Sequence, residues 1–422
     1  MIMMARHSKL FWLSGLVALL LATIVHLALT AAGPQRWDAW VHLLLYGWIS
    51  CSIFAVNYHT TPVFSGRNFP KPAWLELHWL VWSLGVVLAS SGLVWYSQLS
   101  YRLGLGLEWL GSWLFMWNIM QLLRSPKLRP SMPSSPLQQQ IDRLSTLATK
   151  TSGASLPLAL SLILAREFGL IHSRWLLSAE HLLTLGWMML MIIGVACHVL
   201  PRWSGQATRD PRWLKVGLSL HHLGLLSIVL GLGVDLPALF ALGASFILVA
   251  LACCVWLLIP ALATPPVKQP SQLSIVQPRR IGPLTMWSIR AAVFYLAVGI
   301  GLGISFAFDR ALGAQLRPIH VESNLAGFAT ILIYGMAYFM IPRFMGRPLG
   351  LANIANWQVF LAISAVAIID LGWAGLVAGL AWARWLLVFG ASIHGLAALL
   401  FSLSMLATIY QPVPLRRLAH KS

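Results

Sequence analysis

Charged side chains are scarce in this sequence, and acidic ones are the scarcest. Only 9% of the 422 residues are Asp, Glu, Lys or Arg, and 11 acidic residues stand against 29 basic ones. Hydrophobic residues make up 58% of the chain, and the mean hydropathy is +0.76. A soluble globular domain carries about 25% charged residues. The composition therefore excludes that class and indicates a polytopic membrane protein.

Cysteine is also rare, and its placement excludes several kinds of site. The four cysteines all fall within apolar runs, and none belongs to a CxxCH haem-attachment motif or to a metal-ligand spacing: Cys51, Cys197, Cys253 and Cys254. Buried thiols in such runs are typical of small apolar packing residues. The sequence therefore predicts neither a disulfide framework nor a covalently attached haem.

Long apolar runs are what the chain has in abundance. A run of about twenty apolar residues crosses the hydrocarbon core of a bilayer as a helix. About twelve such spans can be placed, at 10–32, 40–62, 74–96, 105–123, 154–172, 177–200, 214–234, 237–262, 287–308, 319–341, 354–376 and 382–409. The predicted fold class is an all-α integral membrane protein, and its first partner is the lipid bilayer.

The basic residues are distributed unevenly between the two sides of these spans. With the N-terminus inside, seven of the 29 Lys and Arg residues lie outside and the other 22 (29 − 7) lie inside; the outer seven are Arg36, Arg102, Arg166, Arg174, Arg310, Arg317 and Arg384. This positive-inside pattern predicts cytoplasmic termini, and it explains the net charge without a nucleic-acid partner. A cleavable signal over residues 1–32 is the alternative, and its removal would leave eleven spans.

One stretch recurs three times in altered form. The first copy has His42, Gly47, His59, Pro62 and Gly66; the second has His181, Gly186, His198, Pro201 and Gly205; the third has Glu322, Gly327, Phe339, Pro342 and Gly346. The starts lie 139 (181 − 42) and 141 (322 − 181) residues apart. A fixed frame of this kind indicates an internal repeat of one structural unit.

The repeat organises the whole chain into three equivalent units. The sequence predicts one polytopic domain over 1–422, with pseudo-repeats of four spans at roughly 1–140, 141–280 and 281–422 and with the motif on the second span of each. Segments 124–150 and 263–286 are rich in proline and polar residues, and we interpret them as flexible linkers between units.

Histidines supply the candidate ligands. A single histidine within a span is more often a hydrogen-bonded packing residue than a metal ligand. The outer group, which contains His26, His42, His181, His320 and Glu322, differs because three of its members occupy the same position of the repeat. Threefold packing would bring those three, His42, His181 and Glu322, to one depth around a common axis.

With these motifs, the chain resembles the subunit I superfamily of the haem–copper oxidases. It is most similar to the NnrS branch, membrane proteins associated with nitric oxide and bacterial denitrification. The resemblance rests on His42 to Gly47, on Pro62 and Gly66-Arg67, on the segment His181 to Gly186, and on His320-x-Glu322 in the tenth span. It implies a haem–copper oxidase subunit I-like fold.

The resemblance also implies cofactors and their ligands. His320 corresponds to the axial ligand of a high-spin haem and His42 to a ligand of a low-spin haem. Glu322 stands where the family has the second low-spin ligand, and His394 of the last span is a candidate to replace it. Copper would be bound by His181, with the adjacent pair His221 and His222 as weaker candidates. The implied cofactors are therefore haem and copper.

Three functions stay open at this point. The first is an NnrS-like haem- and copper-binding protein of nitric oxide metabolism or nitrosative stress. The second is a divergent cytochrome c oxidase or nitric oxide reductase subunit, an oxidoreductase with an electron-donor or partner subunit. Leu185 occupies the place of the family's redox tyrosine, which argues against ordinary oxygen reduction. The third is a non-redox transporter or assembly factor in which the repeat serves packing alone.

Overall fold

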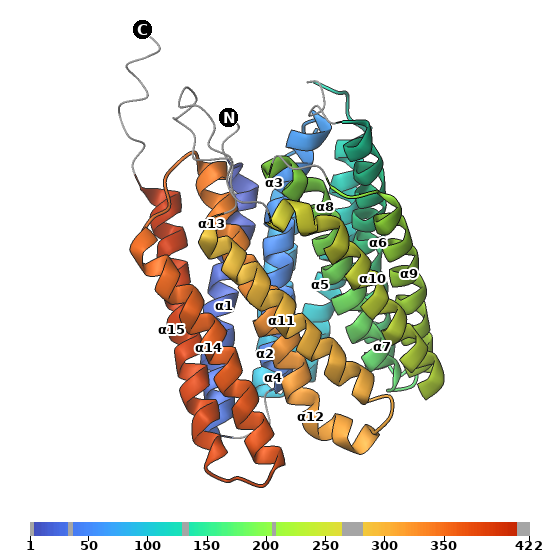
Figure 1. The fold of residues 1–422 in the computed structure, drawn as a ribbon, viewed down its shortest axis with the longest axis vertical. Coiled ribbons are helices and arrows are strands. Elements are labelled where there is room, and N and C mark those ends of the chain that lie inside the picture. Colours follow the sequence, from blue (N-terminus) through green and yellow to red (C-terminus); the bar gives the residue numbers. More distant parts are fainter. Residues whose placement is uncertain (1–3, 33–36, 129–134, 205–207, 264–281, 412–422) are drawn as a thin grey trace.

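The structure is a computed structural model that describes residues 4–32, 37–128, 135–204, 208–263 and 282–411. These residues form a helical bundle, with the start of α1 and the end of α15 at the same end of the molecule and with α7 and α12 toward the opposite end (Figure 1). The helices of the first unit are α1 (Arg6–Ala32), α2 (Trp37–His42), η1 (Leu43–Ile49), α3 (Ser50–Ser65), α4 (Ala73–Trp95) and α5 (Gln98–Arg124).

The other two units follow the same plan of four long helices. The second contains α6 (Pro136–Glu167), α7 (Trp175–His181), η2 (Leu182–Met189), α8 (Leu190–Ser204), α9 (Arg212–Gly233) and α10 (Pro237–Ala263). The third contains α11 (Pro283–Ser305), α12 (Arg310–Glu322), η4 (Ser323–Thr330), α13 (Ile331–Met345), α14 (Ala352–Val377) and α15 (Ala383–Tyr410). In each unit the second long helix is continuous through a short α-helix, a π-helical segment and a second α-helix.

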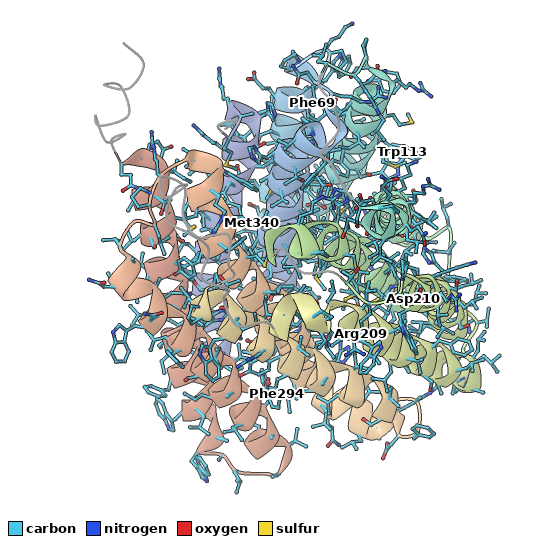
Figure 2. The ribbon with its side chains drawn as sticks, turned by 45° about the horizontal axis from the view of Figure 1, so that its top comes forward. Phe69, Trp113, Arg209, Asp210, Phe294 and Met340 are labelled. Carbon is cyan, nitrogen blue, oxygen red and sulfur yellow. The ribbon has the colours of Figure 1, made fainter. Side chains whose placement is uncertain are left out.

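The described part of the chain confirms the all-α membrane fold. Eleven of its helices are long and apolar enough to cross a membrane. The remaining long helix, α5, spans 27 residues and carries Arg102 and Glu108. Large apolar side chains also cover the outside of the bundle: Trp113 is 47% exposed and Phe294 is 63% exposed (Figure 2). Such an exterior needs the bilayer as its solvent.

The prediction of a linker over 124–150 is wrong in its second half. Helix α6 begins at Pro136, and its N-cap residue Ser135 accepts a hydrogen bond from the backbone N–H of Gln138. Serine at the N-cap and proline at the first helical position are strong start signals that outweigh the polar composition. The extension brings Asp142 against Arg202 of α8, where the two terminal guanidinium nitrogens donate to the carboxylate. The other predicted linker lies mainly outside the described residues.

Each π-helical segment begins directly after the first position of the repeat. The preceding residues are His42, His181 and Glu322, and the segments run from 43 to 49, 182 to 189 and 323 to 330. A π-helical turn frees backbone carbonyls that an α-helix would have paired, so such carbonyls need other donors. The three motif spans therefore share a local structure that hydropathy alone does not reveal.

The glycine five residues into each motif brings that span close to the first span of its own unit. A Cβ at Gly47 would lie 2.5 Å from the Cβ of Ala18 on α1, and a Cβ at Gly186 would lie 2.8 Å from the Oγ of Ser155 on α6. At Gly327 it would lie 2.5 Å from the ring of Tyr295 on α11. The repeated glycine thus serves close helix packing, as small residues do in membranes.

A charge pair joins the second and third units at the end of the bundle opposite the start of α1. Arg310 at the start of α12 donates to Asp235 between α9 and α10 over 2.6 Å. This hydrogen bond and the positive charge of Arg310 lower the pKa of Asp235, which lies outside the helices that can cross the membrane. Because exposed pairs of this kind are worth little, we assign it a role in fixing the loops rather than in overall stability.

Candidate metal centre

Three buried side chains from three different helices meet near the far end of the bundle. His26 comes from α1, Glu322 from the last turn of α12, and His394 from α15. Their exposed fractions are 1%, 0% and 1%, and one ligand atom from each lies within 4.8 Å of the other two. Nε2 of His26 lies 3.6 Å from Oε2 of Glu322. No other such group of His, Cys, Asp or Glu occurs among the residues that the structure describes.

The polar atoms of these side chains lack hydrogen-bond partners. Both ring nitrogens of His26, both carboxylate oxygens of Glu322 and Nδ1 of His394 are buried and unpartnered. Leaving one buried donor or acceptor unsatisfied costs about 1–3 kcal/mol, and more for a charged group. The sequence indicates that Glu322 persists only beside water, in a protonated form, or with a cationic or metal partner. Its complete burial removes the first of these.

The donor set fits a single metal ion. Metal bonds to imidazole nitrogen and carboxylate oxygen are about 2.0–2.2 Å long, so neighbouring ligand atoms of one ion lie about 3–4 Å apart. The 3.6 Å contact between His26 and Glu322 already meets this requirement, and the third ligand needs only a small inward shift. Two histidines and one carboxylate that leave other positions open are the ligand set of non-haem iron(II) sites.

The same donors do not fit a haem between the two imidazoles. The rings of His26 and His394 have centroids 6.3 Å apart at 90°. Two axial imidazoles with nitrogens about 2 Å from one iron would show a similar separation. The carboxylate of Glu322, however, lies 3.6 Å from Nε2 of His26, so a haem on that nitrogen would lie against the carboxylate. The arrangement favours a single ion over a porphyrin.

The first unit contains a pair similar to Glu322 and His394, in which the histidine and the carboxylate have exchanged spans. Nε2 of His42, on the second span, lies 2.8 Å from Oε1 of Glu108 on the fourth span, and both side chains are buried. In the third unit the carboxylate is on the second span, as Glu322, and the histidine is on the fourth, as His394. The repeat thus carries a His–carboxylate pair in two units, and His26 adds a third ligand in only one.

The histidines predicted as ligands are not gathered at one point. His42 uses Nε2 for Glu108 and stacks on Tyr46, with ring centroids 4.3 Å apart, so it lies apart from the centre. In His181 and His320, Nδ1 lies 2.8 Å from a backbone carbonyl, of Leu177 and Gly299 respectively. Because a carbonyl only accepts, Nδ1 of each carries the hydrogen and Nε2 keeps its lone pair. This is the tautomer that metal-binding histidines commonly show.

The adjacent pair on α9 has structural partners. Nε2 of His221 donates to the carbonyl of Leu185 over 3.0 Å, and Nδ1 of His222 donates to the carbonyl of Leu218. Leu185 lies within the second π-helical segment, so His221 satisfies a carbonyl that this segment frees. In the first unit Trp82, also on the third span, donates to Tyr46 at the same place of the repeat. The proposed copper roles of both histidines stay predictions.

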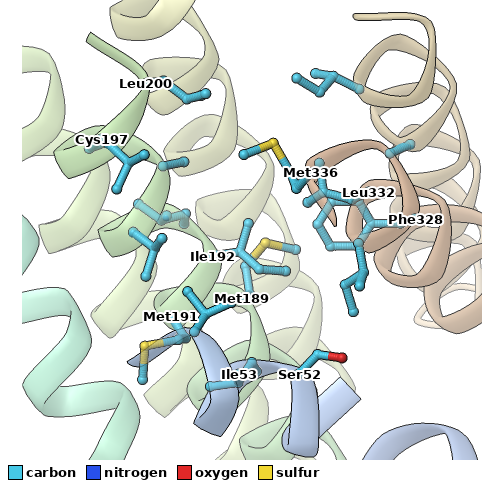
Figure 3. A pocket seen from close by; sticks show the side chains of 18 of the residues that line it. Ser52, Ile53, Met189, Met191, Ile192, Cys197, Leu200, Phe328, Leu332 and Met336 are labelled. Atoms are coloured by element: carbon cyan, nitrogen blue, oxygen red, sulfur yellow. The ribbon is translucent and has the colours of Figure 1, made fainter. Parts of the chain in front are cut away.

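An apolar cavity of about 240 Å³ lies between the three motif spans, on the side of the centre toward the start of α1. Its walls include Met189, Met191, Met336, Phe328 and Cys197 (Figure 3). No histidine or carboxylate is among its lining residues, and its volume is below the range of about 300–1,000 Å³ typical of ligand pockets. We assign it no cofactor.

The sequence named Glu322 and His394 as candidate haem-binding residues, and it did not name the third member of this group, His26, among them. His26 shares the depth of the other outer histidines, which is a signal, yet it lies on the first span and outside the repeated motif. A helix-by-helix reading cannot tell which way its imidazole faces. Its neighbours in the structure show this: the ring stacks on Trp40, with centroids 4.6 Å apart, and lies against His394.

A hydroxyl holds the π-helical segment that follows Glu322. Thr330 donates to the carbonyl of Leu325, five residues earlier, over 2.9 Å, and Ser50 does the same to Leu45 in the first unit. If the π-helical segment η4 became α-helical without losing a residue, Glu322 would rotate about the helix axis by about 100° relative to α13.

We expect Thr330→Val to weaken metal binding about tenfold, as loss of a supporting group outside the ligand set commonly does. Thr330→Ser should restore the affinity, because it restores the hydroxyl. Titration of the metal-free protein with Co²⁺ measures the effect. Ser50→Ala is the matched control and should leave the affinity unchanged. Equal binding by the wild type and Thr330→Val would contradict this role.

Comparison with solved structures agrees with the architecture. The chain is similar to a haem–copper terminal oxidase dimer solved by cryo-electron microscopy, with 12% sequence identity and a TM-score of 0.70 over 97% of this chain and 85% of that chain. No family model and no curated protein matches the sequence. At this identity the likeness shows the fold alone: the chain is a multi-pass membrane protein with a haem–copper oxidase-like fold.

Proposed function

We propose that this protein is a membrane metalloprotein that binds one non-haem ion through His26, Glu322 and His394 and acts in nitric oxide metabolism. The observation that carries the proposal is the convergence of five unpartnered ligand atoms in the buried interior. An ion would neutralise Glu322 and pair all three side chains at once, which lowers the cost of burying them. Iron(II) is the first choice, because this ligand set is typical of it.

The nitric oxide part of the proposal has separate support. Three protein ligands leave positions on the ion for a small molecule. The sequence features that resemble NnrS proteins, His42 to Gly47 and His181 to Gly186, favour nitric oxide as that molecule. The NnrS resemblance supports a bacterial cytoplasmic membrane, and the charge distribution of the loops supports cytoplasmic termini. A haem, which the fold resemblance also suggests, would be bound through Nε2 of His320, which keeps its lone pair, as does Nε2 of His181.

Metal analysis and spectroscopy of the purified protein test this function. We expect one iron per chain after expression with iron and removal of loosely bound ions, together with a quartet-spin iron–nitrosyl EPR signal when nitric oxide is added to the reduced protein. His394→Ala should lose both. His172→Ala replaces an exposed loop histidine and should keep both. A haem absorption spectrum that survives in His394→Ala but not in His320→Ala would assign the haem to His320.

A wild-type protein with neither metal nor haem after such expression would overturn the proposal. It would then favour the non-redox transporter or assembly factor. Proton-coupled turnover with a reduced donor would instead favour the divergent oxidase or nitric oxide reductase.

A further inference from the structure

Three tryptophans pack against one another on the His26 side of the metal centre. Trp40 of α2 stacks on His26, with centroids 4.6 Å apart and ring planes at 29°. Trp37 lies 4.6 Å from Trp40, and Trp373 of α14 meets Trp37 edge-on at 5.8 Å. We call Trp37, Trp40 and Trp373 the tryptophan wall. It joins α2 and α14 beside the ligand that α1 contributes.

Two members of the wall carry buried N–H groups that have nothing to donate to. Nε1 of Trp40 and Nε1 of Trp373 are both buried and unpartnered, and Trp40 has an exposed fraction of 0%. An indole nitrogen is a donor only, so an acceptor must be supplied to it. The great majority of buried polar groups find one, and the exceptions require an explanation.

The two buried carboxyl groups near the centre do not accept hydrogen bonds from these indoles. The oxygens of Glu322 make no hydrogen bond and would be taken up by the ion. Asp370 uses Oδ2 to accept from Ser323 over 2.9 Å, and its Oδ1 has no partner either. The missing acceptor is therefore not provided by these side chains.

We propose that the tryptophan wall is the binding surface for the free end of a small ligand on the ion, a ligand whose outer atom accepts hydrogen bonds. The inference rests on the proposed function. The wall offers N–H groups and no acceptor, so it selects against ligands that can only donate. The buried setting limits the ligand to a few atoms. A nitrosyl and a small linear anion such as azide share this chemistry.

Two other tryptophans allow a matched control. Trp12 and Trp48 also have buried, unpartnered indole nitrogens, but they pack on each other and on Phe401 rather than on His26. An unpaired indole is therefore not by itself a sign of a ligand in this chain. Only the indoles beside the centre should respond to a ligand on the ion.

The experiment uses the full-length protein loaded with Co²⁺, whose visible bands report ligands, and titrates it with azide. We expect Trp40→Phe, which keeps the ring and removes the N–H, to weaken azide binding about tenfold while the cobalt stoichiometry stays at one per chain. Trp48→Phe should bind azide as the wild type does. Reduced iron-loaded protein titrated with nitric oxide shows whether the nitrosyl depends on Trp40 in the same way.

The outcomes separate the inference from the function on which it rests. The role of the wall would be overturned if Trp40→Phe and Trp373→Phe both bind metal and keep unchanged affinities for azide and nitric oxide. The proposal of a metal centre would be unaffected by that result. A wild type that binds no metal would overturn the proposed function itself. If Trp40→Phe loses the metal, Trp373→Phe decides: weaker azide binding supports the wall, and unchanged binding refutes it.

Discussion

Replacing Glu322 by Gln should abolish metal binding at micromolar concentrations, with a loss of affinity of more than about 100-fold. The change keeps the shape of the side chain but removes the negative charge and one of the oxygens that bind. Loss of a supporting group outside the ligand set commonly costs about 10- to 100-fold, so loss of a ligand should exceed that range. Calorimetric titration of the metal-free protein with Zn²⁺ or Co²⁺ measures the change directly.

The control for this experiment is Glu76→Gln, since Glu76 lies at the other end of the bundle and makes only a 3.6 Å contact to the exposed Arg6. It should bind as the wild type does. Because a ligand that binds only the folded protein stabilises it by about 2.7 kcal/mol at 100 times its dissociation constant, metal should raise the melting temperature of the wild type and not that of Glu322→Gln. Metal binding of wild-type strength in Glu322→Gln would refute the centre.

Replacing either member of the pair His42 and Glu108 alone should destabilise the protein by about 3–5 kcal/mol. Each substitution leaves the other polar group buried without its partner, in a setting where water cannot replace it. The 2.8 Å contact is the pair's principal hydrogen bond, since Oε2 of Glu108 has no partner. Reversible unfolding in mixed micelles measures the loss for His42→Leu and for Glu108→Leu.

The double variant gives the sharper test. Replacing both residues by leucine removes both buried polar groups at once, and such replacements are often neutral or stabilising. We therefore expect the double variant to be more stable than either single one, with metal binding intact because the pair lies apart from the centre. The importance of the pair would be contradicted if each single variant loses less than about 1 kcal/mol of unfolding free energy. It would also be contradicted if the loss in the double variant equals the sum of the two single losses.

The membrane fold could be predicted from the sequence because it follows from properties that are local. Long apolar runs fixed the approximate positions of the spans, and the repeated frame from His42 to Gly66 marked the second span of each unit. The beginning of α6 differs from the predicted linker because the capping signal of Ser135 and Pro136 outweighs the polar composition around them.

The metal centre was harder to predict for a different reason. Its ligands come from spans one, ten and twelve, and their meeting depends on how each helix is rotated about its own axis. The π-helical segment after Glu322 changes that rotation, and a pattern with a period of 3.6 residues cannot show it. Depth along the membrane could be read for His26 and Glu322, which the sequence places in one outer group. The sequence places His394 near the middle of the last span, and it gives the direction of none of the three side chains.

The contact between α1 and α15 implies an order of assembly for the metal centre. Within the described part of the chain, His26 lies on the first long helix and His394 on the last, 368 residues later (394 − 26). A growing chain that already contains His26 and Glu322 still offers an ion two ligands from distant helices and no third. If the centre binds an ion as proposed, loading of the metal would therefore require insertion of α15. The bound ion would close a very long loop, the situation in which a cross-link restricts the unfolded chain the most.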